Sequence, residues 1–293
     1  MTDQQHTVRR RIAINPLPWV FPSADFSFGT RKNWDIAARF HAGLGYEAMV
    51  LAEATDEVEG SLADRFDRFG LIPAPGYLGV SADQPQSQRI AQTRAAARQH
   101  RKFGLSEMFL ALRSVPERRA HPAEGVLADP DRTGRLAVAL AELAGVAHDE
   151  GVTAAFHPHT GSWIETESET RQVLDATAGS ALAFGPDIGH LTWAGADVMS
   201  LFSDYSHRIA GVHVKDVALA QVQAARRVGA DYRSATVDHH VWTEPTRGDA
   251  DFAGILDLLP ADFTGWFIVE VDEPSLPTRE ESSRFALEVT ATL

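Results

Sequence analysis

Residues 152–174 read VTAAFHPHTGSWIETESETRQVL, a stretch that joins the signals of a strand to those of a helix. The apolar run 152–156 is typical of a buried strand. Thr166 and Glu169 form a T-x-x-E pattern, which predicts a capping box at the start of a helix. His157 and His159 stand between the two elements, and residues two apart on an extended strand point to the same side. The stretch predicts a βα unit whose two imidazoles face one environment.

This alternation of a short apolar run and a longer segment with helical spacing recurs along the chain. The eight candidate strands cover residues 12–19, 46–53, 71–80, 107–113, 152–159, 181–190, 209–217 and 265–273. Helical apolar spacing marks segments between them, such as 88–103 and 131–149. Eight such pairs predict an α/β fold of the (β/α)8 TIM barrel type, with residues 1–293 as a single domain. The competing fold is a doubly wound open sheet, but no strand is followed by a glycine-rich nucleotide-binding motif.

Residues 218–252 are long for the connection between a barrel strand and its helix. The side chains in this segment that are suited to binding are Tyr232, His239, His240, Trp242, Glu244 and Arg247. We interpret the segment as a loop-rich insertion over the mouth of the barrel rather than as a second domain.

Composition narrows the possible partners. The 27 Lys and Arg residues against 40 Asp and Glu residues give a formal charge of −13. Because nucleic-acid backbones are bound by clusters of basic residues, we expect no nucleic-acid partner. The chain has no cysteine, so any metal must be held by nitrogen and oxygen ligands. It lacks both a long apolar run and the apolar block of a signal peptide, so we expect a cytoplasmic protein without a membrane partner.

Chemically active side chains stand at the ends of four consecutive predicted strands. They are His157 and His159, Asp187 and His190, His213 and Lys215, and Glu270. In a TIM barrel the C-terminal ends of the strands converge on one mouth. Any one of these residues alone is more often structural, but burying two carboxylates beside several histidines is costly unless a cation neutralises them. The set predicts a divalent metal site.

Four runs of sequence carry a family resemblance. They are FHPHTGSWIETESE, PDIGHLTWAG, RIAGVHVKDV and GWFIVEVDEP, and they lie within residues 150–290. Together they resemble the xylose-isomerase-like barrels of sugar isomerases and epimerases, and within that family the inosose dehydratase branch. Toward the N-terminus the resemblance is carried by INPLPW and by the barrel periodicity.

The resemblance implies a set of metal ligands, one from each of the last four strands. Asp187, His213 and Glu270 match the aspartate, histidine and glutamate of the family, and His157 stands where many members have a glutamate. A histidine at that position suits Mn²⁺, Co²⁺ or Zn²⁺ better than Mg²⁺, with Mn²⁺ as the first expectation.

The resemblance also implies the residues that meet the substrate. His159, His190, Lys215 and Glu270 are expected to share the acid, base and orienting roles, with Glu270 as both ligand and base. His159 and His190 are expected to contact substrate, and Lys215 to contact substrate oxygens or to pair with a carboxylate. Apart from the resemblance, four aromatic residues stand near predicted strand ends, where they can stack on a sugar ring or pack in the core or at the rim: Trp19, Phe21, Trp163 and Trp193. Arg247, Gly248 and Asp251 lie in EPTRGDADF (244–252), a partial match to a glycine-rich run of the branch, and Arg247 is expected at the pocket lip.

One departure concerns the second predicted strand. The dehydratase branch carries a glutamate late in this strand, and the matching position here is Val50. Glu53 comes three residues later and does not simply replace it. The substrate therefore need not be an inosose.

The expected chemistry is removal of a proton next to a ketone, because a metal that binds the ketone oxygen acidifies the adjacent C–H. Loss of a β-hydroxyl from the enolate gives a dehydratase acting on a sugar or cyclitol, which is the first expectation. Reprotonation gives a 3-epimerase or an aldose–ketose isomerase. Expulsion of a carbon-linked aglycone from a 3-keto C-glycoside gives a C-glycoside deglycosidase α-subunit, which needs a β-subunit partner. A zinc endonuclease of the same barrel class is disfavoured by the charge, and a homo-oligomer is expected from the family.

Overall fold

Parallel strands form a ring in the computed structural model, which describes residues 10–20, 31–51 and 59–293 of the 293-residue chain. The strands of the ring are β1 (Arg11–Asn15), β2 (Ala48–Val50), β3 (Ile72–Ala74), β4 (Tyr77–Val80), β5 (Glu107–Leu112), β6 (Thr153–Phe156), β7 (Ala183–Phe184), β8 (Gly211–Val214) and β11 (Trp266–Glu270). They pair in the orders β3-β2-β1-β11-β8 and β4-β5-β6-β7. Parallel bridges from Phe184 to Ile209 and from Asp187 to His213 join β7 to β8. The predicted TIM barrel is confirmed.

The remaining gap in the ring lies between β3 and β4, which together form the third predicted strand. Leu51 N–H donates to Ala74 O on one side, and Phe109 N–H donates to Gly76 O on the other, both at 2.9 Å. The chain therefore changes its pairing partner from β2 to β5 across Pro75 and Gly76. Proline has no N–H for a ladder, which explains the break at this point.

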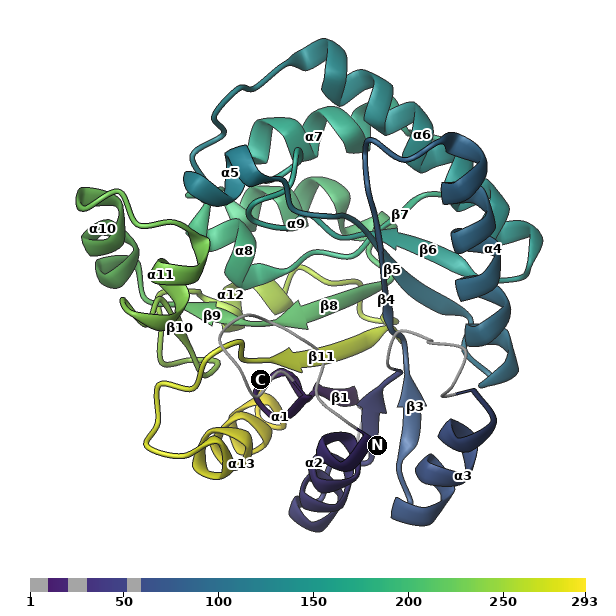
Figure 1. Cartoon of the computed structure of the whole chain (residues 1–293), viewed down its shortest axis with the longest axis vertical. Helices are drawn as coiled ribbons and strands as arrows, with labels where there is room; N and C mark the ends of the chain where they lie inside the picture. The colour runs from purple at the N-terminus through teal and green to yellow at the C-terminus, as the bar shows by residue number, and fades with distance from the viewer. Residues whose placement is uncertain (1–9, 21–30, 52–58) are drawn as a thin grey trace, which may run out of the picture.

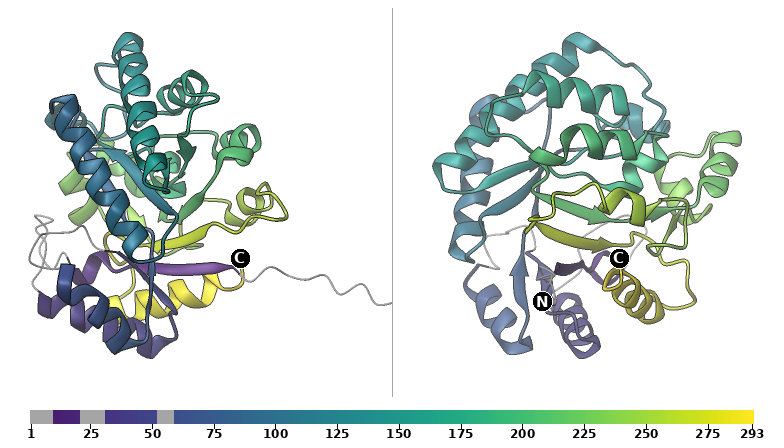
Figure 2. Two further views of the ribbon diagram at one scale, coloured as in Figure 1. Left: turned by 90° about the vertical axis from the view of Figure 1, so that its right-hand side faces the viewer. Right: turned by 180° about the vertical axis from the view of Figure 1, so that it is seen from behind.

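Helices form an outer layer around the ring, and the views from front, side and behind agree on this arrangement (Figures 1 and 2). They are α1 (Leu17–Val20), α2 (Arg31–Leu44), α3 (Glu59–Phe69), α4 (Gln86–Lys102), α5 (Pro116–Ala120), α6 (Pro130–Asp149), α7 (Glu167–Ala176), α8 (Ile188–Trp193), α9 (Val198–Tyr205), α10 (Leu219–Arg227), α11 (Tyr232–Val237), α12 (Phe252–Leu256) and α13 (Arg279–Thr290), with a 3₁₀ turn at Ser206–Arg208. The capping box predicted for Thr166 and Glu169 is present at the start of α7. Among the described residues, no helix has the length and apolarity needed to cross a membrane.

Every predicted strand is shorter in the structure than in the sequence pattern, and two of them run on into a helix. The run 181–190 forms only β7 as a regular strand, because Pro186 has no N–H to donate and Asp187 then caps α8 by accepting a hydrogen bond from His190 N at 2.8 Å. The run 12–19 ends as β1 at Asn15, and α1 begins after Pro16. In both places apolar residues continue past the strand into a helix, and apolarity alone does not show where the strand ends and the helix begins.

The segment 218–252 contains α10, α11 and the short strand β10 (Trp242–Thr243). β10 pairs antiparallel with β9 (Asp216–Val217), the continuation of the strand that begins as β8. Tyr232 and Trp242 pack on Trp193, with ring centroids 5.4 Å and 5.0 Å away. The arrowhead of β8 points toward this group of elements in Figure 1.

Candidate metal centre and active site

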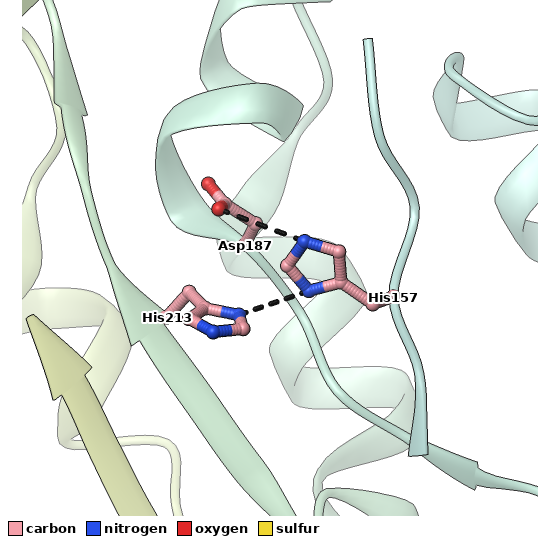
Figure 3. A group of neighbouring side chains, drawn as sticks. All are labelled: His157, Asp187 and His213. Atoms are coloured by element: carbon pink, nitrogen blue, oxygen red, sulfur yellow. Dashed lines mark hydrogen bonds and ion pairs between the residues drawn. The ribbon is translucent and has the colours of Figure 1, made fainter. Parts of the chain in front are cut away.

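The end of the barrel at which β6, β8 and β11 terminate gathers the predicted metal ligands. His157 follows β6, Asp187 precedes α8, His213 lies on β8, and Glu270 is the last residue of β11. All four are buried, with exposed fractions between 0% and 7%. Figure 3 shows the side chains of His157, Asp187 and His213 pointing toward one another. Phe109 lies against this group, its ring centroid 4.3 Å from that of His213 and 5.9 Å from that of His157.

The spacing of the ligand atoms suits one shared cation. His157 Nε2 lies 3.9 Å from Asp187 Oδ2, and His213 Nε2 lies 4.0 Å from Glu270 Oε2. Both distances are too long for a hydrogen bond. They lie within the span of two ligands that each bind one metal at about 2.1 Å, which is at most about 4.2 Å. Candidate ligand atoms of His157, Asp187 and His213 all lie within 4.8 Å of one another.

The side chain of Asp187 gives the clearest indication of a cation-binding site in this cluster. Its Oδ1 accepts the N–H of His190, whereas its Oδ2 is buried without a hydrogen-bond partner among the described residues. Burial raises the pKa of Asp187 to about 8. A buried carboxylate oxygen without a donor is costly, and a bound cation would remove that cost. The donor set of imidazole nitrogens and carboxylate oxygens therefore fits a divalent metal.

The histidines of the cluster are neutral and able to act as ligands. Burial lowers the pKa of His213 to about 4 and that of His157 well below its ordinary value. His157 Nδ1 lies 2.9 Å from His213 Nδ1 and 3.2 Å from Gly185 O. In the contact between the two Nδ1 atoms one ring donates and the other accepts, so the neutral ring that donates its Nδ1–H can present its Nε2 lone pair to a cation.

Lys215 is a fully buried cation beside these ligands. Its Nζ lies 2.8 Å from Glu270 Oε1, 2.7 Å from Asp272 Oδ1 and 3.2 Å from His190 Nε2. Burial alone would lower the pKa of Lys215, but Asp272 and Glu270 hold it well above its ordinary value. The same ammonium lies 4.2 Å from the ring centre of Trp242. Lys215 is therefore a permanent charge shared between two carboxylates.

The rings of His159 and His190 are in contact next to the cluster, with their centroids 3.8 Å apart and their planes inclined by 44°. His159 Nδ1–H donates to Thr160 O at 2.7 Å, which leaves its Nε2 with the lone pair. Burial lowers the pKa of His159 to about 4, so the ring is neutral. His190 also belongs to a second group of possible ligand atoms, with Asp187 and Glu270.

Asn15 and Asp272 extend the site beyond the predicted residues, and Tyr232 of the segment 218–252 joins them. Asn15 Nδ2 donates to Glu270 Oε2 at 2.6 Å, and Tyr232 OH donates to Asp272 Oδ2 at 3.1 Å. Asp272 could have been found from the sequence, because it lies two residues after Glu270 on the same chain segment. Asn15 at the end of β1 could have been found by the rule that placed the other strand ends.

The other predicted substrate contacts have their described interactions elsewhere. Trp19 stacks on Phe40 and on the Arg279 guanidinium, and the Arg132 guanidinium lies over Trp163. The structure does not bring Trp19 or Trp163 into ring contact with the histidine cluster in the described part of the chain. The Arg247 side chain lies 3.4 Å from Glu244, with its guanidinium 5.7 Å from the Phe285 ring. Phe21 and Glu53 lie outside the described residues, and Val50 is buried at the end of β2.

Residues 39–292 match the family model for the xylose isomerase-like TIM barrel. The chain belongs to the xylose isomerase-like TIM barrel family. A curated relative, inosose dehydratase from Geobacillus kaustophilus (strain HTA426), is 26% identical over 271 residues, which is 90% of this chain and 87% of the relative.

Solved structures with low sequence identity to this chain share its fold. The IolI protein with a binding zinc atom superposes with a TM-score of 0.69 at 15% identity, covering 96% of this chain and 97% of that one. D-allulose 3-epimerase from Methylomonas sp. in complex with D-allulose gives a TM-score of 0.69 at 16% identity, covering 97% of each chain. This xylose isomerase-like barrel is thus a member of a family of metal-dependent sugar isomerases, epimerases and dehydratases, with a buried His/Asp/Glu cluster suited to a divalent metal.

Proposed function

We propose that this chain is a divalent-metal-dependent lyase that removes water from a keto-cyclitol or keto-sugar, in the manner of inosose dehydratase. The observation that carries the proposal is the pair of histidine Nε2 atoms facing carboxylate oxygens at 3.9 Å and 4.0 Å, one of which, Asp187 Oδ2, is buried without a hydrogen-bond donor among the described residues. The reaction class is supported by the dehydratase relative, which aligns over 90% of the chain.

His157, Asp187, His213 and Glu270 would hold the metal, with Mn²⁺ first among the candidates and Co²⁺ or Zn²⁺ as alternatives. Two imidazoles and two carboxylates form a ligand set that suits these ions, since Mg²⁺ prefers oxygen alone. A divalent cation held by these residues would supply Lewis-acid chemistry, since it would polarise a ketone oxygen and make the neighbouring C–H more acidic. The remaining steps belong to side chains of the protein.

His159 is the proposed base. Its Nδ1–H is committed to Thr160 O, so its Nε2 lone pair is the atom that takes the α-proton. The imidazolium formed in this way can return a proton to the β-hydroxyl as the C–O bond breaks. One C–H bond and one C–O bond are lost, a C=C bond forms, and water leaves.

Lys215 and His190 are proposed to orient rather than to transfer protons. Each contact of the Lys215 ammonium with Glu270, Asp272 and His190 fixes the position of the partner. His190 Nε2 accepts from Lys215, so its neutral ring carries the proton on Nδ1 and can donate it to a substrate oxygen. Trp19, Trp163 and Arg247 are not needed for this scheme.

Val50 supports a second candidate reaction. The dehydratase branch has a glutamate at this position, whereas Val50 is apolar and only 9% exposed. The same proton removal, without that glutamate, is compatible with a ketose 3-epimerase or isomerase. It is equally compatible with a C-glycoside deglycosidase α-subunit acting on a 3-keto C-glycoside, in which case a β-subunit would be the partner.

The test is to incubate the Mn²⁺-loaded protein separately with 2-keto-myo-inositol, simple ketoses and a 3-keto C-glycoside. Formation of an enone from the inosose supports the dehydratase. Formation of an epimerised or isomerised sugar would instead support the epimerase or isomerase. Release of the aglycone would support the C-glycoside deglycosidase. In each case His159→Gln should abolish turnover while His148→Gln, at an exposed histidine of α6, leaves it unchanged.

A further inference from the structure

We propose that Glu165 is a positioning residue for His159 and acts through the peptide group between Thr160 and Gly161. The inference rests on the proposed role of His159 as the base. It assigns a task to a buried carboxylate that does not contact the metal ligands.

The C=O and the N–H of the peptide between Thr160 and Gly161 bond to different side chains, His159 and Glu165. Thr160 O accepts the His159 Nδ1–H at 2.7 Å, and Gly161 N–H donates to Glu165 Oε2 at 2.7 Å. Because a peptide group is planar, its C=O and N–H turn together. A rotation that breaks the bond to Glu165 therefore also breaks the bond to His159.

The turn formed by residues 159–162 can adopt a second backbone conformation. Ser162 N–H donates to His159 O at 3.0 Å, and Gly161 has a φ of +88°. These features mark residues 159–162 as a type II turn. A type I turn differs by a flip of the central peptide, which here is the peptide 160–161. In the flipped turn Thr160 O would point away from the His159 ring.

Glu165 is held firmly enough to select between the two turns. Its side chain is 1% exposed, and Oε2 also accepts Ala123 N–H at 3.0 Å. Oε1 accepts Gly125 N–H at 3.0 Å and Arg118 Nη1 at 2.8 Å. With four donors in place the carboxylate has no freedom to rotate, so it favours the turn that presents Gly161 N–H.

The consequence for His159 is a single tautomer. While Thr160 O accepts from Nδ1, the proton stays on Nδ1 and Nε2 stays a base. When the peptide flips, this restraint is lost, and a share of the rings carries the proton on Nε2 and cannot accept another. Glu165 thereby sets the fraction of molecules that are competent for proton removal.

Glu165→Gln tests this with Glu169→Gln as the matched control. Both glutamates pair with Arg118, but in the described structure only Glu165 bonds to the 160–161 peptide. In Glu165→Gln the remaining oxygen should stay with charged Arg118, because charge-assisted bonds are the stronger ones. The amide NH₂ then faces Gly161 N–H and repels it, and the turn should flip.

The first readout is the ¹⁵N spectrum of the histidine rings in the Mn²⁺-free, Zn²⁺-loaded protein, with His159 assigned by the signals missing in His159→Gln. The native protein and Glu169→Gln should show only the Nδ1–H tautomer of His159, and Glu165→Gln a mixture. The second readout is turnover, which should fall in Glu165→Gln by the same fraction as the Nδ1–H tautomer of His159, with KM and metal content unchanged.

Gly161→Ala provides a second variant that leaves the carboxylate untouched. A φ of +88° is unfavourable for alanine, so this variant should also shift the turn and the tautomer. An unchanged His159 tautomer in the folded variants would overturn the inference, whatever happens to turnover. A mixed tautomer with undiminished turnover would support the positioning by Glu165 and count against His159 as the base.

Discussion

Lys215 sets the charge balance of the candidate site at the scale of single residues. Three buried carboxylates, Asp187, Glu270 and Asp272, surround one ammonium, which leaves two negative charges when all are ionised. One divalent cation would neutralise these two negative charges. The balance explains why Lys215 can remain in a site that also suits a metal: each cation has its own share of the carboxylates.

Replacing Lys215 with methionine should destabilise the metal-free protein by about 3–5 kcal/mol, because two buried carboxylates lose their cation. Urea unfolding of the metal-free protein measures the loss. Lys102→Met, at an exposed lysine at the end of α4, is the control and should change the free energy of unfolding by less than about 0.5 kcal/mol. A loss of similar size in the two variants would contradict the role assigned to Lys215.

Single residues were predictable from the sequence where a strand end determined their direction. His157, Asp187, His213 and Glu270 meet in the structure because the ends of parallel strands converge. The same argument gave no orientation for Trp19, Trp163 or Arg247, which lie outside the strands. Aromatic and basic side chains there can turn toward the helices as readily as toward the mouth, and Trp19 and Trp163 pair with guanidinium groups.

At the scale of elements, the position of α8 depends on close contact with the strand of Lys215. A Cβ placed on Gly189 would lie 2.9 Å from Lys215 Cγ and 3.0 Å from the Lys215 carbonyl group. The helix also begins at Asp187, whose Oδ1 caps it while Oδ2 faces the cluster. One carboxylate thus links the start of a helix to the candidate metal centre.

Gly189→Ala should therefore push α8 away from Lys215 and lower both turnover and metal affinity. Gly145→Ala in α6 is the matched control, since nothing lies within 4 Å of its added Cβ. This control should be neutral or stabilise the protein by up to about 1 kcal/mol through helix propensity. Metal titration of both variants measures the effect, and equal affinities in the two would refute the packing argument.

Element boundaries were the part of the fold that the sequence predicted least well. The eight strand positions were correct because short apolar runs alternate with helical segments. Their ends were wrong at Pro16 and Pro186, where apolar sequence continues into α1 and α8. The division of the third strand at Pro75 was also missed, because it depends on which neighbour each half pairs with.

At the scale of the whole molecule, the first and last parts of the described chain close the barrel together. β1 pairs with β11, and Ser283 of α13 bonds to His41 of α2, its Oγ lying 3.1 Å from His41 Nε2. His41 is fully buried, and its Nδ1–H donates to Ala37 O at 2.7 Å. Figures 1 and 2 show α13 beside α2, and the described residues on both helices are joined through this histidine.

The burial of His41 predicts acid sensitivity of the closed barrel. Burial lowers its pKa to about 4, from 6.5 in the unfolded chain. Between these values the unfolded state binds more protons, so stability falls as the pH drops through this window. From pH 7 to pH 5 the loss from this residue should be about 2 kcal/mol.

Urea unfolding at several pH values measures this dependence. His41→Gln should reduce the slope of unfolding free energy against pH, whereas His207→Gln, at an exposed histidine, should leave it unchanged. Equal slopes in the two variants would mean that His41 is not buried in its neutral form.

Metal analysis of the purified protein tests the central claim most directly. The account predicts about one equivalent of a divalent metal per chain, and His157→Ala should lose the metal together with about 100-fold or more of the turnover. His148→Ala, at an exposed histidine, should retain both. Absence of bound divalent metal, with His157→Ala leaving activity unchanged, would contradict the account.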